Sequence, residues 1–163
     1  MAINANGRKK LLVSSAVHPN YRAVLKTYCD GLDVEIDELP IAANGTTDLS
    51  SLREALASKQ YAALALQSPN FFGAIDALPA EMLGAVRESE TVPIAVVAEA
   101  LSLAALATPA SWGAEIVAGE AQSFGVPVAY GGPYVGFIAA TAEHMRRIPG
   151  RLVGKTLDNR GGE

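Results

Sequence analysis

The chain has 163 residues and a formal net charge of −4, with 50% hydrophobic and only 18% charged residues. This length is enough for one sizeable core and short for two domains, and the acidic balance argues against a nucleic-acid binder. The single cysteine, Cys29, excludes an internal disulfide, and its place on an expected helix indicates a small buried thiol. No apolar run is long enough for a signal-peptide core or a membrane span. The plain expectation is a cytoplasmic protein that binds neither nucleic acid nor membrane.

Short apolar segments alternate with helical patterns along the chain. Helices are expected at 19–30, with apolar residues at helical spacing, at 48–59 behind the capping Asp48, and from Asp76 to about residue 86. Strands are expected at 11–13, 34–39, 61–66, 93–97, 114–117 and 134–138. Apolar strands that alternate with helices form a largely parallel sheet covered on both faces. The predicted fold class is α/β, a three-layer sandwich with a mostly parallel sheet.

The two ends of the chain show less order than the middle. Residues 1–10 have no apolar period and are expected to be a tail or a truncated linker. Residues 11–163 are expected to form a partial large α/β domain, with one possible short strand at 151–153 near its end. Whether the chain is a natural short protein or a fragment stays open at this point, as does its oligomeric state.

A glycine-rich loop at 120–136 runs into an apolar strand and resembles the cofactor loop of pyridoxal-phosphate enzymes of the aspartate aminotransferase type. In those enzymes a lysine at the end of a strand forms a Schiff base with the cofactor. Gln122 stands at the matching position of this chain. An amide nitrogen is not nucleophilic, so covalent catalysis of that kind is excluded at this site.

Other motifs in the chain fail on spacing or context. Residues 150–156 are one residue short of a P-loop, and the glycines at 131–136 lack the order of a dinucleotide-binding fold. Ser123 lies in a segment like a nucleophile elbow, but no helix can begin directly after it, so its hydroxyl is expected to bond within its own loop. His18 and His144 are too isolated to predict a metal site.

The segment at 67–73 follows a predicted parallel strand, where the loops of open α/β sheets converge on a ligand crevice. Its polar and flat apolar side chains suit an interface or a substrate channel, and they are Ser68, Asn70, Phe71 and Phe72. Tyr134 is predicted to belong to the same set. A turn that anchors an aromatic side chain in the core explains the same residues equally well. Both alternatives remain open from the sequence.

Four segments together are similar to subunit 1 of the two-chain glycine dehydrogenase (decarboxylating), the P-protein of the glycine cleavage system. They are residues 17–22, 67–73, 119–125 with 131–137, and 149–154. The resemblance implies part of the large domain of fold type I pyridoxal-phosphate enzymes. It also implies a longer family subunit, more than twice the length of this chain.

The resemblance further implies a division of labour between two subunits. P-protein is an oxidoreductase that binds pyridoxal phosphate, decarboxylates glycine and passes the aminomethyl group to the lipoyl arm of H-protein. The cofactor lysine belongs to subunit 2, so no catalytic residue and no bound cofactor are expected here. A vestigial site is implied at Glu99, which stands where related chains carry the aspartate that pairs with the pyridine nitrogen, and at Gln122, Gly131 and Gly132. The expected partners are subunit 2 and H-protein.

Two other functions remain possible from the sequence. One is a stand-alone α/β binding or structural domain without catalytic activity. The other is a self-sufficient pyridoxal-phosphate enzyme that recruits a different amine, such as Lys155. Under the favoured interpretation, the isolated chain is inactive.

Overall fold

The computed structural model describes residues 1–151, 153–154, 157 and 160. Within them lies one six-stranded sheet of strand order β2-β1-β3-β4-β5-β6. The first five strands are parallel, and β6 runs antiparallel to β5. The strands are β1 (Lys10–Ser14), β2 (Glu35–Leu39), β3 (Tyr61–Gln67), β4 (Val92–Val97), β5 (Ile116–Glu120) and β6 (Gly136–Ala140).

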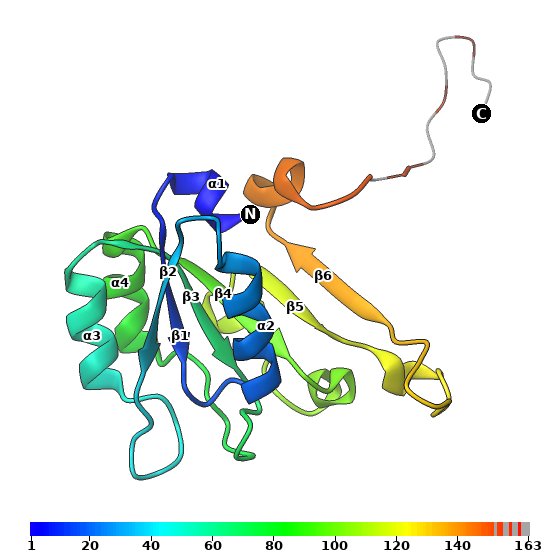
Figure 1. Cartoon of the computed structure of the whole chain (residues 1–163), viewed down its shortest axis with the longest axis horizontal. Coiled ribbons are helices and arrows are strands. Elements are labelled where there is room, and N and C mark those ends of the chain that lie inside the picture. Colours follow the sequence, from blue (N-terminus) through cyan, green and yellow to red (C-terminus); the bar gives the residue numbers. More distant parts are fainter. Residues whose placement is uncertain (152, 155–156, 158–159, 161–163) are drawn as a thin grey trace.

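Helices lie on both faces of this sheet, with α3 and α4 on one face and α1 and α2 on the other (Figure 1). Short 3₁₀ helices (η) occupy several connections. The α-helices are α1 (Ala2–Asn6), α2 (Pro19–Cys29), α3 (Leu49–Ala57) and α4 (Ala80–Ser89), and the 3₁₀ helices are η1 (Ala100–Ala104), η2 (Pro109–Trp112), η3 (Gln122–Phe124) and η4 (Ala142–Arg147). The predicted three-layer α/β fold with a mostly parallel sheet is confirmed.

Side-chain caps explain why two helices begin where the sequence predicted. The Asp48 carboxylate accepts a hydrogen bond from the backbone N–H of Ser51 at 2.7 Å, which satisfies a free donor in the first turn of α3. At α2, the ring Nδ1 of His18 accepts from the backbone N–H of Asn20 at 3.1 Å, and Pro19 occupies the first turn.

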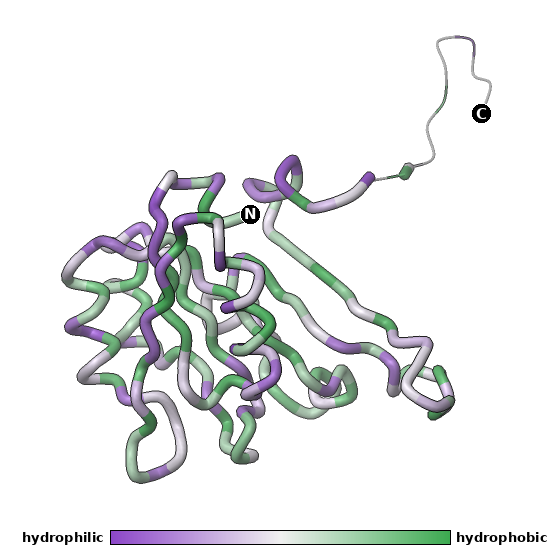
Figure 2. Tube along the Cα trace, viewed as in Figure 1, coloured by the Kyte–Doolittle hydropathy of each residue, from purple (hydrophilic) through white to green (hydrophobic). Residues whose placement is uncertain are grey.

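The larger core lies between the sheet and the α3–α4 layer. It contains Leu52 and Leu56 of α3, Met82 and Val86 of α4, and Leu64 of β3, all buried. Figure 2 shows the hydrophobic tracks of the central strands that these helices cover. A smaller core under α1 joins Ala2 to Ala63, Val92 and Ile116. Most of the buried apolar area, and with it most of the hydrophobic stabilisation, therefore lies on one side of the sheet.

Several predicted boundaries are wrong. Asp76 does not start a helix, because α4 begins at Ala80 after Pro79, and Asp76 is buried and bonded to Thr47. The fifth and sixth strands each begin two residues later than expected and extend further. The periodicity of short apolar runs does not set their ends, since pairing with the neighbouring strand decides where each ladder stops.

Residues 1–10, expected to be a tail or linker, carry helix α1 and the first residue of β1. Ala2 is buried, the Asn6 amide donates to the carbonyl of Ala62, and the Arg8 guanidinium donates to the carbonyls of Tyr61 and Ser89. These contacts hold the segment on the sheet. The division of the chain into a tail and a partial large domain stays a prediction.

Helix α2 is much less buried than its pattern indicated. Three of its apolar residues are exposed by 40% (Tyr21), 53% (Val24) and 75% (Tyr28), and Cys29 is the one buried residue of the helix. Burial raises the pKa of the Cys29 thiol, as expected for a small buried thiol. The apolar stripe of α2 is real, but much of it does not face this sheet.

Gly119 of β5 is required by the close packing around it. A Cβ atom at this position would overlap the carbonyl oxygen of Val97 on β4 and lie 2.7 Å from Cε1 of Phe137 on β6. We expect Gly119→Ala to lower the free energy of unfolding by about 1–3 kcal/mol, because the backbone of β4 cannot move aside without breaking the ladder.

The matched control is Gly84 of α4, where an added Cβ meets no atom within 4 Å. Gly84→Ala is expected to raise the free energy of unfolding by about 0.5–1 kcal/mol, since alanine favours a helix interior. Urea denaturation followed by circular dichroism measures both. Equal effects of the two substitutions would contradict the packing described at β5.

Candidate functional site

The carboxyl ends of the parallel strands meet at one edge of the sheet and carry the candidate site. Glu99 lies two residues beyond the end of β4, Glu120 is the last residue of β5, and Gln122 begins η3. Because β4 and β5 are paired in parallel, with Val97 opposite Gly119, the segments that leave them start side by side. The structure thus places Glu99 and the Gln122 segment on the same edge of the sheet.

The Glu99 carboxylate is held by the segment that contains Gln122. Its Oε1 accepts hydrogen bonds from the Ser123 hydroxyl at 2.5 Å and from the backbone N–H of Leu101 at 2.9 Å. These bonds, that of Ser123 first, lower the pKa of Glu99, against a smaller opposing effect of desolvation. The expectation that Ser123 bonds within its own loop is wrong, since its partner belongs to the loop after β4.

A carboxylate that the sequence did not single out closes the base of the glycine loop. Oε1 of Glu120 accepts from the backbone N–H groups of Gln122 at 2.8 Å and Val135 at 3.2 Å. The Glu120 carboxylate therefore links Gln122, just after β5, to Val135, just before β6. The two N–H donors reach one side chain only because β5 and β6 pair. The spacing of residues in the sequence does not predict this contact.

The two glycines of the expected vestigial site lie farther along this loop, which projects from the sheet beyond η3 (Figure 1). A Cβ at Gly132 would meet no atom within 4 Å, and one at Gly131 would meet only the Tyr134 hydroxyl, at 3.8 Å. Tyr134 itself is exposed. The glycines therefore border open space in this structure and do not form a closed cradle.

The chain matches the family model for the glycine cleavage system P-protein over residues 1–163. It is 49% identical, over 97% of its length, to a probable glycine dehydrogenase (decarboxylating) subunit 1 of Moorella thermoacetica. It also superimposes on an inhibitor-bound crystal structure of glycine decarboxylase (P-protein), with a TM-score of 0.87 at 37% identity over 99% of the chain. The chain belongs to the glycine cleavage system P-protein family.

The match covers only part of these relatives. The chain spans 35% of the Moorella thermoacetica protein and 35% of the crystallised P-protein. A more distant likeness, at 16% identity and a TM-score of 0.57, is to an O-acetylhomoserine (thiol)-lyase of Campylobacter jejuni that contains an N'-pyridoxyl-lysine-5'-monophosphate. This likeness shows that the P-protein fold is shared with fold type I pyridoxal-phosphate enzymes.

The described lysines of this P-protein family member lie away from the candidate site. Lys10 begins β1 and Lys9 precedes it, Lys59 precedes β3, and Lys26 lies in the last turn of α2. The segments that leave β4 and β5 contain no lysine up to residue 151. Lys155, considered above as an alternative amine, lies outside the described residues. The side chains at this edge therefore do not fit a pyridoxal phosphate held as a Schiff base.

The loop after β3 is fastened by buried polar groups. Asn70 is buried, its Oδ1 accepts from the backbone N–H groups of Phe72 and Ala74, and its Nδ2 donates to the carbonyl of Gly45. The Ser68 hydroxyl oxygen accepts from the backbone N–H of Asp76. These two members of the predicted interface or channel set are engaged within the fold.

The aromatic residues of the same loop are turned outward. Phe71 and Phe72 are exposed, and their rings lie 5.4 Å apart in an edge-to-face arrangement. The His18 ring lies 4.9 Å from Phe71 and 5.0 Å from Tyr21, so aromatic groups from α2 and the loop form one exposed cluster. The alternative of an aromatic side chain anchored in the core is wrong for this loop, because both phenylalanines are exposed and the buried anchor is Asn70.

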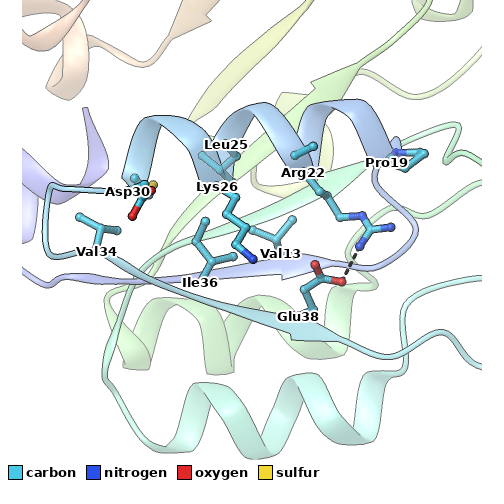
Figure 3. Close-up of a pocket in the computed structure, with 11 residues that line it drawn as sticks. Val13, Pro19, Arg22, Leu25, Lys26, Asp30, Val34, Ile36 and Glu38 are labelled. Carbon is cyan, nitrogen blue, oxygen red and sulfur yellow. Dashed lines mark hydrogen bonds and ion pairs between the residues drawn. The ribbon is translucent and has the colours of Figure 1, made fainter.

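A separate groove of about 450 Å³ lies between α2 and strands β1 and β2 (Figure 3). Its floor includes Val13 and Ile36, and the Arg22 guanidinium donates to Glu38 at 2.5 Å on its rim. It lies at the β2 edge of the sheet, away from Gln122.

In the described part of the chain no three metal-binding side chains gather, and His144 instead bonds to Glu115 at 2.7 Å. None of the described helices is long and apolar enough to cross a membrane.

Removal of the Ser123 hydroxyl should change how Glu99 titrates. Because the hydrogen bond stabilises the ionised carboxylate, Ser123→Ala is expected to raise the pKa of Glu99 toward its ordinary value. NMR titration of the side-chain carboxyl carbon measures the shift. Ser123→Thr keeps a hydroxyl and should leave the pKa low, and an unchanged pKa in the alanine variant would contradict the contact.

Loss of the buried carboxylate under the loop should destabilise the fold. Asp76 accepts from both the hydroxyl, at 2.7 Å, and the backbone N–H of Thr47, at 3.1 Å, and Thr47 is almost fully buried. We expect Asp76→Ala to cost about 1–3 kcal/mol of unfolding free energy, because the buried backbone N–H of Thr47 would lose its partner, whereas the Thr47 hydroxyl keeps its bond to Ser14. Chemical denaturation tests this, with Glu88→Ala on the exposed surface of α4 as the control, expected to stay within about 0.5 kcal/mol.

Proposed function

We propose that this chain is part of the cofactor-free subunit of a glycine cleavage P-protein. In this function a partner subunit of the subunit 2 type holds pyridoxal phosphate and supplies the reactive lysine. The assembled enzyme decarboxylates glycine and transfers the aminomethyl group to the lipoyl arm of H-protein. The chain alone carries out neither step and is inactive.

One observation supports the cofactor-free role above the others: Gln122 lies directly after β5, where an amine is needed. A protein that uses pyridoxal phosphate must provide an amine that forms an imine, a partner for the pyridine nitrogen, and donors for the phosphate. Gln122 cannot provide the first. Glu99 is tied to Ser123 and Leu101, and Gly131 and Gly132 border open space.

The exposed aromatic cluster of His18, Tyr21, Phe71 and Phe72 supports a role at a subunit interface or substrate channel. Aromatic side chains are enriched at the centres of protein interfaces, where they bury a large area at low entropic cost. The cluster lies at the carboxyl edge of the sheet, next to the loops that carry Glu99 and Gln122. In this proposal the cluster faces the cofactor-bearing subunit.

The second candidate is a stand-alone α/β binding or structural domain. It differs from the first proposal in one measurable respect, because a stand-alone domain needs no subunit 2.

Co-expression separates the candidates. The tagged chain is produced together with an untagged subunit 2 of the P-protein family, purified in the presence of pyridoxal phosphate and reduced with borohydride. We expect the two chains to co-purify and peptide mapping to find the pyridoxyl group on a lysine of subunit 2. Failure to co-purify would favour the stand-alone domain.

The same mapping on the chain purified alone tests the cofactor-free assignment. We expect no stoichiometric pyridoxyl-lysine on this chain, and Gln122→Lys is the matched variant that restores an amine after β5. A stoichiometric pyridoxyl group on a native lysine of the chain, such as Lys155, would contradict the proposal and favour a self-sufficient enzyme.

A further inference from the structure

The groove between α2 and strands β1 and β2 is lined by both apolar and charged side chains. Val13 of β1 and Ile36 of β2 form its floor, Leu25 of α2 belongs to its wall, and Val34 lies at the end where β2 begins. Its volume of about 450 Å³ falls within the range of small-molecule sites, about 300–1,000 Å³. A groove of this size and lining fits a ligand that has an apolar part.

Three charged residues of α2 line the groove at intervals of one helical turn. Arg22, Lys26 and Asp30 are four residues apart, and Asp30 caps the carboxyl end of the helix. Residues at this spacing lie on one side of a helix, about 6 Å apart along its axis. The order along the groove is therefore cation, cation and anion (Figure 3).

The first of these charges is neutralised within the chain. The Arg22 guanidinium donates to the Glu38 carboxylate at 2.5 Å and to the carbonyl of Val17 at 3.1 Å. The Ser15 hydroxyl donates to the same Glu38 oxygen at 3.3 Å. This network closes the end of the groove that lies next to the carboxyl ends of β1 and β2.

The other two charges have no such partner. Neither the Lys26 ammonium nor the Asp30 carboxylate forms an ion pair or a hydrogen bond with any residue that the structure describes. A lysine four positions before an acidic residue is in the less favourable order for a helical ion pair. The partial negative charge at the carboxyl end of α2 also disfavours a carboxylate there and favours an ammonium group. An unpaired cation and an unpaired anion thus lie about one turn apart beside an apolar floor.

We propose that this groove binds an α-amino acid with an apolar side chain. The carboxylate of the ligand pairs with Lys26, and its ammonium group pairs with Asp30 at the carboxyl end of α2. The ligand's side chain lies on the apolar floor around Ile36. The two charges of an α-amino acid are borne by neighbouring groups, so one small molecule reaches both side chains across a single helical turn. This inference goes beyond the cofactor-free role and does not depend on it.

Titration of the chain with L-leucine, followed by nitrogen–proton correlation NMR, tests the proposal. We expect saturable binding with a dissociation constant of about 0.1–10 mM, and shift changes centred on the amides of Lys26, Asp30 and Ile36. Three matched probes each lack one group of leucine: isocaproate lacks the amine, isoamylamine lacks the carboxylate, and glycine lacks the side chain. Each should bind at least about threefold more weakly, because one charge loses its partner or the apolar floor stays in water.

Variants of the two unpaired residues assign the ends of the ligand. Lys26→Met and Asp30→Asn each remove one charge at an exposed position, and each should weaken leucine binding at least about threefold. Lys26→Met should also abolish the preference for leucine over isoamylamine, and Asp30→Asn the preference for leucine over isocaproate. Arg53→Met and Glu54→Gln make the same charge changes on the exposed surface of α3, across the sheet, and should leave binding unchanged. Circular dichroism confirms that every variant folds.

Several outcomes would overturn the proposal. They are a lack of saturation up to about 100 mM leucine, shift changes centred away from the groove, and equal affinities of all four variants. Equal affinities for leucine and isocaproate would show a simple carboxylate site instead. None of these results changes the expected co-purification with subunit 2, so the two proposals can fail separately.

Discussion

The parallel pairing of β4 with β5 is the constraint on which the candidate site depends. It brings the segments that follow these strands to one edge of the sheet, so that Ser123 of the second can donate to Glu99 of the first. Close approach is possible because Gly119 has no side chain between the carbonyl of Val97 and the ring of Phe137. The site geometry is therefore a consequence of strand packing, and a single methyl group on β5 would disturb it.

Several polar groups at this edge are hydrogen-bonded within the chain, whereas several aromatic side chains are exposed. Glu99 and Glu120 bond to the loops around them, and Asn70 and Asp76 fasten the loop after β3. The exposed groups are instead Phe71, Phe72 and Tyr134. Such a surface suits contact with another protein better than binding of a small charged ligand, because the charged and polar groups are already paired within the chain.

The uneven distribution of the core is the second feature with a functional consequence. One face of the sheet is covered by α3 and α4, whereas the other carries, among the described helices, α1 and the loosely packed α2. An uncovered apolar face on a parallel sheet is energetically costly in water. The apolar stripe predicted from the sequence of α2 is accordingly left partly exposed.

Much of this protein was determined by the sequence alone: the alternation of strands and helices, the cap at Asp48, the amide side chain at Gln122, and the family. These features depend on residue type and short-range spacing, which the sequence states directly. The start of α4 at Ala80, the bond between Ser123 and Glu99, the role of Glu120 and the exposure of α2 were decided only by the tertiary structure. Each of these depends on which distant segments become neighbours, and strand pairing and layer packing, rather than local propensity, settle that.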